Sequence, residues 1–211
     1  MRKPGILLLL TLISFFAKAQ YAGYKEVGDP SGFKSAFAAA SQKINSIRSR
    51  FVQEKSLSML EEKMVSEGQF LFKKENRVRM EYEKPFKYLM IINNNQVYIR
   101  DGEKENKISS KSNRIFNQIN RIMIDCVQGT MLANPDFSVR LFENNQHGLI
   151  ELMPLTKSMK DLFKSILITI DRSDFSASRI DMNEINGDNT VIRLTNKNLN
   201  VEIPDSLFII H

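Results

Sequence analysis

The residues that most often perform catalysis or bind metals are scarce in this sequence of 211 residues. It contains one cysteine, Cys126, and two histidines, His147 and His211. A Cys/His zinc site needs more such ligands and a single cysteine forms no internal disulfide, so we predict that Cys126 is a small buried hydrophobe on a helix. The sequence has no glycine-rich phosphate loop, and its carboxylates follow no catalytic pattern. It therefore predicts a protein that is not an enzyme and that uses no cofactor or metal.

The N-terminal residues have the composition of a secretory signal peptide. Two basic residues at 2–3 precede an apolar run at 6–16, and a small-x-small cleavage site follows at 17–19. We expect residues 1–19 to be removed and the mature chain to begin at Gln20. The alternative is an uncleaved membrane anchor, but the apolar run is shorter than the roughly 20 residues that a spanning helix needs. No cysteine follows the signal to carry a lipid, so we expect a product that is released from the membrane.

The charge of the chain argues against nucleic acid as a partner. The whole sequence has 30 lysines and arginines against 24 acids, a formal net charge of +6. Because residues 1–19 carry three of the bases, the expected mature chain has a net charge of +3. That excess is too small to indicate nucleic-acid binding. The length of residues 20–211 fits one domain with a sizeable core, and we find no internal repeat.

Two stretches have the spacing of amphipathic helices. The first is predicted to have Asp29 as its N-cap and Pro30 in its first turn. The second covers residues 112–129, and Gly129 is expected to end it. The apolar stripe of the first consists of Phe33, Phe37, Ile44, Ile47 and Phe51, and that of the second contains Ile115, Ile119, Ile122 and Cys126.

Most of the remaining chain has the period of two that is typical of half-buried antiparallel strands. Phe70 and Phe72 share one face, and at residues 77–83 apolar side chains alternate with charged ones. The stretch "YLMII" at 88–92 is apolar on both faces, which favours a more central strand. Further strands are predicted in "VYIRD" at 97–101, "FSVRLFEN" at 137–144, "GLIELMPL" at 148–155, "SILITID" at 165–171, "ASRIDMNEI" at 177–185, "NTVIRLTNK" at 189–197 and "SLFII" at 206–210.

This order of elements predicts an α+β fold. A run of hairpins with two amphipathic helices indicates a strongly curved antiparallel sheet that is covered by α-helices on its concave face. Such a sheet encloses either a packed core or a cavity, and the pattern does not decide between them.

From Phe51 onward, a series of short motifs resembles the LolA family of periplasmic lipoprotein carriers. The family pattern has a first helix ending in Phe-x-Gln, a glycine that opens a strand with basic residues near its end, a proline, an apolar strand and a turn. The matching elements here are "FVQ" at 51–53, Gly68, "FLFKKENRVRMEY" at 70–82, Pro85, "YLMII" at 88–92 and "QVYI" at 96–99. Looser matches continue in "LMPL" at 152–155, "ILITID" at 166–171 and "NLNVEIPDSLFII" at 198–210.

The resemblance implies both a fold and an activity. The fold is an incomplete β-barrel of LolA/LolB-like type, with helices as a lid over an apolar cavity. Members of the family are carriers, not enzymes; they receive lipoprotein acyl chains from an inner-membrane ABC transporter and pass them to an outer-membrane acceptor. We therefore expect a periplasmic monomer with these partners. The alternative is that the same scaffold senses lipoproteins or carries another lipid or apolar biosynthetic product.

We expect the cavity to lie between the bent sheet and the helices. Phenylalanine and methionine suit a cavity whose contents change, and the sequence has fourteen and ten of them. The alternative is that each of these residues simply packs in an ordinary hydrophobic core. The candidate lining residues are Phe70, Phe72, Met80, Tyr82, Ile115, Ile119 and Met123.

The resemblance also implies a basic residue that fastens the lid to the sheet. The family often has an Arg-Pro or Lys-Pro pair on this strand, whereas this chain has Lys74 followed by Glu75. Lysine is a weaker multidentate donor than arginine, and Arg79 is a second candidate. We expect Lys74 or Arg79 to donate hydrogen bonds to backbone carbonyls of residues 122–129. The alternative is that Arg77 and Arg79 lie on a solvated strand face.

Overall fold

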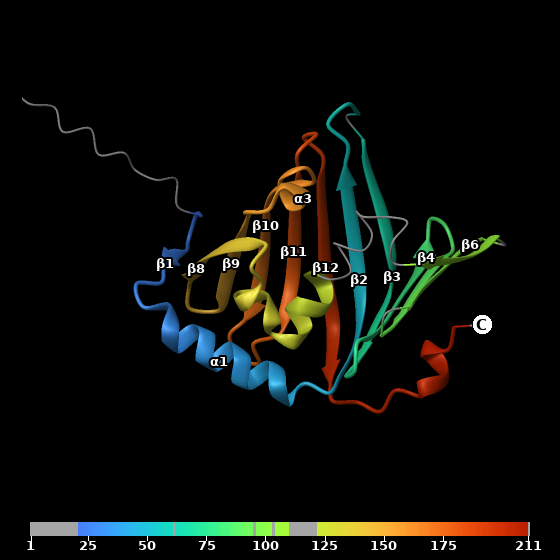
Figure 1. Cartoon of the computed structure of the whole chain (residues 1–211), viewed down its shortest axis with the longest axis horizontal. Coiled ribbons are helices and arrows are strands. Elements are labelled where there is room, and N and C mark those ends of the chain that lie inside the picture. The colour runs from blue at the N-terminus through green and yellow to red at the C-terminus, as the bar shows by residue number, and fades with distance from the viewer. Residues whose placement is uncertain (1–20, 61, 95, 103, 110–121, 211) are drawn as a thin grey trace, which may run out of the picture.

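The computed structural model describes residues 21–210, apart from residues 61, 95, 103 and 110–121 (Figure 1). Its centre is one sheet of twelve antiparallel strands in the order β1-β8-β9-β10-β11-β12-β2-β3-β4-β5-β6-β7. The order has two ends, so the sheet is curved but open. The strands are β1 Lys25–Glu26, β2 Ser46–Ser56, β3 Lys63–Lys73, β4 Arg77–Lys84, β5 Tyr88–Asn93, β6 Gln96–Asp101, β7 Lys104–Ser109, β8 Phe137–Glu143, β9 His147–Pro154, β10 Phe163–Asp171, β11 Ala177–Glu184 and β12 Asn189–Leu199.

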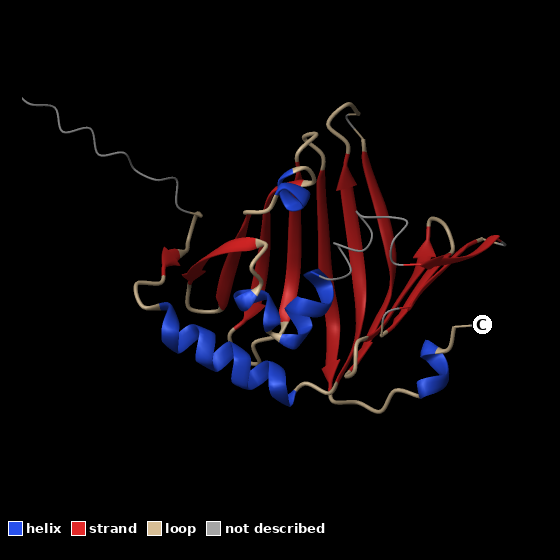
Figure 2. Ribbon diagram, in the orientation of Figure 1, coloured by secondary structure: helices blue, strands red, loops and turns tan. Residues whose placement is uncertain are grey.

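Helical segments cover the concave face of the sheet (Figure 2). They are α1 Pro30–Lys43, the helical residues 122–128, the 3-10 helix η1 Thr130–Ala133 and α3 Lys157–Lys160. This arrangement confirms the predicted α+β fold. In the part of the chain that the structure describes, no helix combines the length and the apolar character needed to cross a membrane. The main core joins Phe37 of α1 and Met123, Cys126 and Val127 of the 122–128 helix to inward-facing residues of the strands, among them Phe51, Phe70, Phe72, Met80, Ile150, Ile166, Ile168, Ile180 and Ile192.

The first helix is shorter than predicted. Its start is as expected, since the Asp29 carboxylate accepts a hydrogen bond from the Ser31 N–H at 2.9 Å. It ends at Lys43, however, and Ile47 and Phe51 lie in β2. Their offset of four fits a helix and is also a multiple of two, so the two residues equally share one face of a strand. Backbone pairing of β2 with β3 and with β12 decides the outcome.

The sheet bends where β2, β3 and β4 meet at Gly68. The β3–β4 register shifts between Glu67 and Gly68, which leaves an extra residue on β4. A Cβ at Gly68 would lie 2.0 Å from the Glu81 carbonyl oxygen and 2.8 Å from the Phe51 ring. Only glycine allows this close approach, and such bulges increase the local twist of a sheet.

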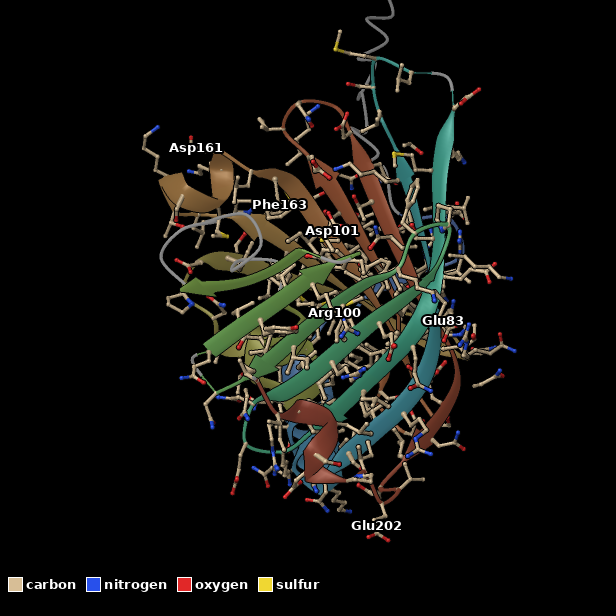
Figure 3. All side chains as sticks on the ribbon, turned by 90° about the vertical axis from the view of Figure 1, so that its right-hand side faces the viewer. Glu83, Arg100, Asp101, Asp161, Phe163 and Glu202 are labelled. Atoms are coloured by element: carbon tan, nitrogen blue, oxygen red, sulfur yellow. The ribbon has the colours of Figure 1, made fainter. Side chains whose placement is uncertain are left out.

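The C-terminal segment, residues 200–210, covers the outer face of the sheet at β3–β6 (Figure 3). Asp205 accepts hydrogen bonds from Lys73 and from Arg77. The Lys73 hydrogen bond, with the Arg77 charge, lowers the pKa of the Asp205 carboxyl. These contacts fasten the segment to the turn between β3 and β4. Beneath it, Ile203 and Phe208 form a second apolar cluster with Leu71, Leu89, Ile91 and Tyr98.

This cover explains why the stretch at 88–92 is apolar on both faces although it is not central. It forms β5, which lies third from the β7 end of the sheet. Met90 and Ile92 face the main core. Leu89 and Ile91 face the C-terminal segment. The prediction of a central strand was wrong because a separate segment buries the second face.

The predicted strand at 206–210 does not form either. Residues Asp205–Phe208 are the 3-10 helix η2, which follows Pro204. The segment lies across the sheet instead of along an edge, so side chains satisfy its backbone: Arg79 donates to the Leu207 carbonyl at 3.1 Å and Asn93 to that of Phe208 at 3.2 Å. Its apolar residues therefore act as a cover for the sheet.

We predict that Gly68→Ala destabilises the protein by about 3 kcal/mol or more, because the added methyl group would overlap backbone as well as an aromatic ring. Gly32→Ala is the control: it lies in α1 with no atom within 4 Å of the added Cβ, so it should be neutral or stabilise by up to about 1 kcal/mol. Urea denaturation measures both. Equal midpoints for the two variants would contradict the assignment of Gly68 as the bend.

Candidate functional site

A cavity of about 450 Å³ lies between the concave face of the sheet and the 122–128 helix. Its walls come from β2, β4, β5, β11 and β12, with Met123 from the helix and residues 161–163 at the start of β10. The size falls within the range of about 300–1,000 Å³ that is usual for pockets enclosing one small ligand. The apolar lining consists of Met80, Tyr82, Tyr88, Met90, Met123, Leu162, Phe163, Met182, Ile185 and Ile192.

Four methionines belong to this lining. Met80 and Met90 are paired neighbours on β4 and β5, Met182 lies on β11, and Met123 faces them from the helix. Methionine is unbranched and polarizable, so its side chain fills gaps of different shapes at little cost. The wall can therefore repack around an apolar ligand.

Aromatic side chains form the wall next to the methionines. The Tyr82 ring lies edge-on to Phe51 at 4.8 Å and to Tyr88 at 5.4 Å between ring centroids. The Tyr82 hydroxyl donates to Gln53 Oε1 at 2.9 Å. Burial raises the pKa of Tyr82, and burial with the nearby Asp101 charge raises that of Tyr88 to about 12. Both phenols therefore stay neutral, and the wall carries no charge at this point.

Polar side chains gather at one end of the cavity. Lys55 Nζ lies 3.3 Å from Glu184 Oε1, and the Thr190 hydroxyl donates to the same oxygen at 3.0 Å. Asp161 follows α3 and lies farther out than Phe163 on β10 (Figure 3). We call this end the mouth; its polar residues are Gln53, Lys55, Asp161, Glu184, Asn186 and Thr190.

Two turns meet beside the mouth. The Ser58 N–H donates to Asp188 at 2.8 Å and its hydroxyl to the Asn186 carbonyl at 3.1 Å, which joins the β2–β3 and β11–β12 turns. Apolar side chains project from them: Met59 is 94% exposed and Ile185 is 52% exposed. An apolar ligand that reaches the mouth therefore meets apolar side chains as well as polar ones.

The comparison with protein families decides what kind of chain carries this cavity. A family model described as outer membrane lipoprotein carrier protein LolA matches residues 42–211. This chain belongs to the LolA family. No curated protein sequence matches it.

Solved structures share the fold at low sequence identity. MucB is 14% identical with a TM-score of 0.54, over 88% of this chain and 64% of MucB. MucB in its complex with MucA from Pseudomonas aeruginosa is 13% identical with a TM-score of 0.52, over 87% of this chain and 61% of the other. A LolA-superfamily protein from Nitrosomonas europaea is 12% identical with a TM-score of 0.48, over 83% and 97%. At these identities the likeness concerns the fold alone.

In this LolA-family chain, three of the seven expected lining residues face the cavity. They are Met80, Tyr82 and Met123. Phe70 and Phe72 lie on the same concave face but are fully packed in the core below it. Ile115 and Ile119 lie outside the described residues.

The sequence did not predict most of the cavity lining that comes from the second half of the chain. Met182 on β11 and Ile192 on β12 show the inward alternation in the sequence. That alternation did not reveal which strands face the helix across the sheet. Tyr88 and Met90 were missed because the stretch at 88–92 is apolar throughout, so its two faces look alike.

The two basic residues have hydrogen-bond partners that differ from the expected ones. Lys74 Nζ donates to the Gln42 carbonyl at the end of α1. Arg79 lies on the outer face, where it donates to the Leu207 carbonyl at 3.1 Å and to Glu81 at 2.8 Å. Neither bonds to carbonyls of residues 122–129 in the described structure. A single strand places successive side chains on opposite faces, so Arg79 points away from the cavity that Met80 lines.

A glutamine connects the 122–128 helix to the sheet instead. Gln128 Nε2 donates to Asn76 Oδ1 in the β3–β4 turn, the same turn that holds Lys74. Gly129, with φ of 72°, ends the helix as predicted. Gln128 therefore contributes a contact that the basic residues were expected to make.

Cys126 is buried on this helix, as predicted. Burial, with the nearby Asp125 charge, raises the pKa of its thiol well above the usual value. A neutral buried thiol is a poor nucleophile. The described residues contain no cluster of three or more His, Cys, Asp and Glu side chains with metal-binding geometry.

We predict that Gln128→Leu increases amide hydrogen exchange in residues 122–128 about fivefold, because one side-chain hydrogen bond contributes about 1 kcal/mol. Lys74→Leu should instead increase exchange at the end of α1. Asn198→Leu, which removes an exposed local bond to the Asn196 carbonyl, is the control. If Lys74→Leu loosened residues 122–128 as much as Gln128→Leu did, the basic residue would be the fastening contact after all.

Proposed function

We propose that this protein is a periplasmic carrier that binds the acyl chains of lipoproteins in its cavity and moves them from the inner to the outer membrane. The observation that supports this proposal is the apolar, methionine-lined cavity between the sheet and the 122–128 helix in a chain of the LolA family. In this proposal an inner-membrane ABC transporter supplies the cargo and an outer-membrane acceptor receives it. The protein itself carries out no reaction.

The energetics of an acyl chain support a binding role for the cavity. Each methylene that leaves water contributes roughly 0.8 kcal/mol, so one long chain gains more than about 10 kcal/mol before any opposing term. Part of this gain is offset, because a ligand larger than the cavity separates Met123 from Met80 and Met90. Those residues then lose apolar contacts of their own. This opposing term allows the carrier to release its cargo.

A second candidate is a carrier or sensor of another lipid or apolar product. The volume of about 450 Å³ favours it, because pockets of this size enclose one small ligand and lipoproteins carry several acyl chains. For lipoprotein cargo, the 122–128 helix has to move farther from the sheet. Mass spectrometry of the ligand that copurifies from the periplasm separates the two candidates: acylated peptides support the first, and a free lipid or pigment supports the second.

We predict that Ile185→Trp weakens binding of a fluorescent long-chain acyl probe by about 1 kcal/mol, roughly fivefold in Kd. The larger side chain narrows the mouth, and Ile185 is exposed enough to change without disturbing the core. Leu155→Trp is a matched control, because Leu155 is equally exposed, 52% for both, and does not line the cavity.

Titration of the probe against the wild type and both variants tests this prediction. Thermal unfolding of the same samples checks that each variant is folded. If Leu155→Trp weakened binding as much as Ile185→Trp, the probe would bind outside the cavity. If the wild type did not bind the probe, the carrier function itself would be contradicted.

The proposal also requires export, with cleavage after residue 19. We predict that the mature protein begins at Gln20 and is found in the periplasmic fraction, because the signal is not followed by a lipidation cysteine. N-terminal sequencing and cell fractionation measure this. Recovery of most of the protein in the membrane pellet after a salt wash, or retention of residues 1–19, would be the contrary result.

A further inference from the structure

The lining of the cavity changes from apolar to polar along three neighbouring strands. On β2 the inward-facing residues run from Phe51 through Gln53 to Lys55, and on β11 Met182 is followed by Glu184. On β12 the change runs the other way, from Thr190 to Ile192, because the strands are antiparallel. Lys55 and Thr190 are paired directly across β2 and β12. All three strands therefore become polar at the mouth.

A ligand with one apolar and one polar end has a single favourable orientation in such a cavity. Its chain lies among the methionines, and its polar end lies at the mouth, where polar groups do not lose their hydrogen bonds. The residues of the mouth therefore determine which polar ends are accepted.

The charge at the mouth disfavours an anionic end. Lys55 is the single cation among the lining residues that the structure describes, and Glu184 already neutralises it at 3.3 Å. Asp161 adds a second carboxylate, whose own partner Lys157 lies outside the cavity and is 89% exposed. An anion at the mouth would have to displace Glu184 from Lys55 and lie close to both carboxylates. At a partly buried site this repulsion is stronger than in water.

An uncharged polar end finds suitable partners at the same place. The second carboxylate oxygen of Glu184 accepts hydrogen bonds, and the side-chain amide of Asn186 both donates and accepts them. Gln53 Oε1 accepts the hydrogen bond from the Tyr82 hydroxyl, so the amide nitrogen of Gln53 is left to donate to a ligand. Ester and amide groups use such donors without bringing a charge.

We propose that the mouth is a head-group site that prefers single-chain amphiphiles with an uncharged ester or amide end over those with an anionic carboxylate end. Glu184 is the residue that determines this preference, because it forms an ion pair with Lys55, the one lysine in the described part of the lining. The inference rests on the proposed function, since it assigns a ligand class to the same cavity.

The experiment compares a fluorescent long-chain fatty acid with its glycerol monoester, at a pH where the fatty acid is ionised. The wild type should bind the ester more tightly. In Glu184→Gln the lysine is free to pair with the carboxylate, so the ratio of the affinity for the fatty acid to the affinity for the ester should rise about tenfold. Lys55→Gln should lower the affinity for the fatty acid further and is a second variant in case the first unfolds.

Glu143→Gln is the matched control. It removes the carboxylate partner of Arg172, at 2.7 Å on β8, and leaves the cavity unchanged, so the ratio of the two affinities should equal that of the wild type. Ester binding without any preference, or a ratio that neither Glu184→Gln nor Lys55→Gln shifts, overturns the head-group site and leaves the carrier function intact. Failure of the wild type to bind either ligand overturns the carrier function, and the head-group site with it.

Discussion

This structure depends on a sheet that is curved but whose two ends do not join. The sheet runs from β1 to β7 without joining its ends, so it cannot cover its own concave face. That face is apolar, and an apolar sheet face needs another layer to exclude water. Segments outside the sheet supply the layer, and they meet it through side chains instead of a continuous backbone ladder. A layer attached in this way need not fill the space beneath it, and the cavity lies where the filling is incomplete.

The two faces of strands β3–β6 are covered in different ways. On the outer face, residues 200–210 are fastened by ion pairs of Asp205 and by hydrogen bonds from Arg79 and Asn93. On the inner face, Met80 and Met90 line the cavity together with Met123 of the 122–128 helix. Among the described residues, one side-chain hydrogen bond, from Gln128 to Asn76, links that helix to the sheet. Among the described residues, the outer cover is therefore fastened by more side-chain bonds than the inner cover, and in the proposed carrier the inner cover is the part that yields to a ligand.

The sequence predicted those features that depend on local pattern. Alternation identified the inward face of β4, including Met80 and Tyr82, and the Asp29 cap identified the start of α1. It could not separate helix from strand at Ile47 and Phe51, because their spacing fits both periods and only pairing with distant strands distinguishes them. Distant contacts also explain the missed lining. The place of β11 and β12 opposite the helix is a property of the whole sheet, as is the direction in which Arg79 points.

In the proposed carrier, a weakly fastened inner cover has a consequence for the direction of transfer. A carrier whose lid was held by many hydrogen bonds would need a large gain from each ligand to open, and it would load slowly. A carrier with no lid contact would leave its methionines exposed to water when empty. The one polar link found among the described residues lies between these limits, so in the proposed carrier the loaded and empty states would be close in free energy. Small differences in the affinity of a donor or an acceptor for either state are then sufficient to set the direction in which cargo moves.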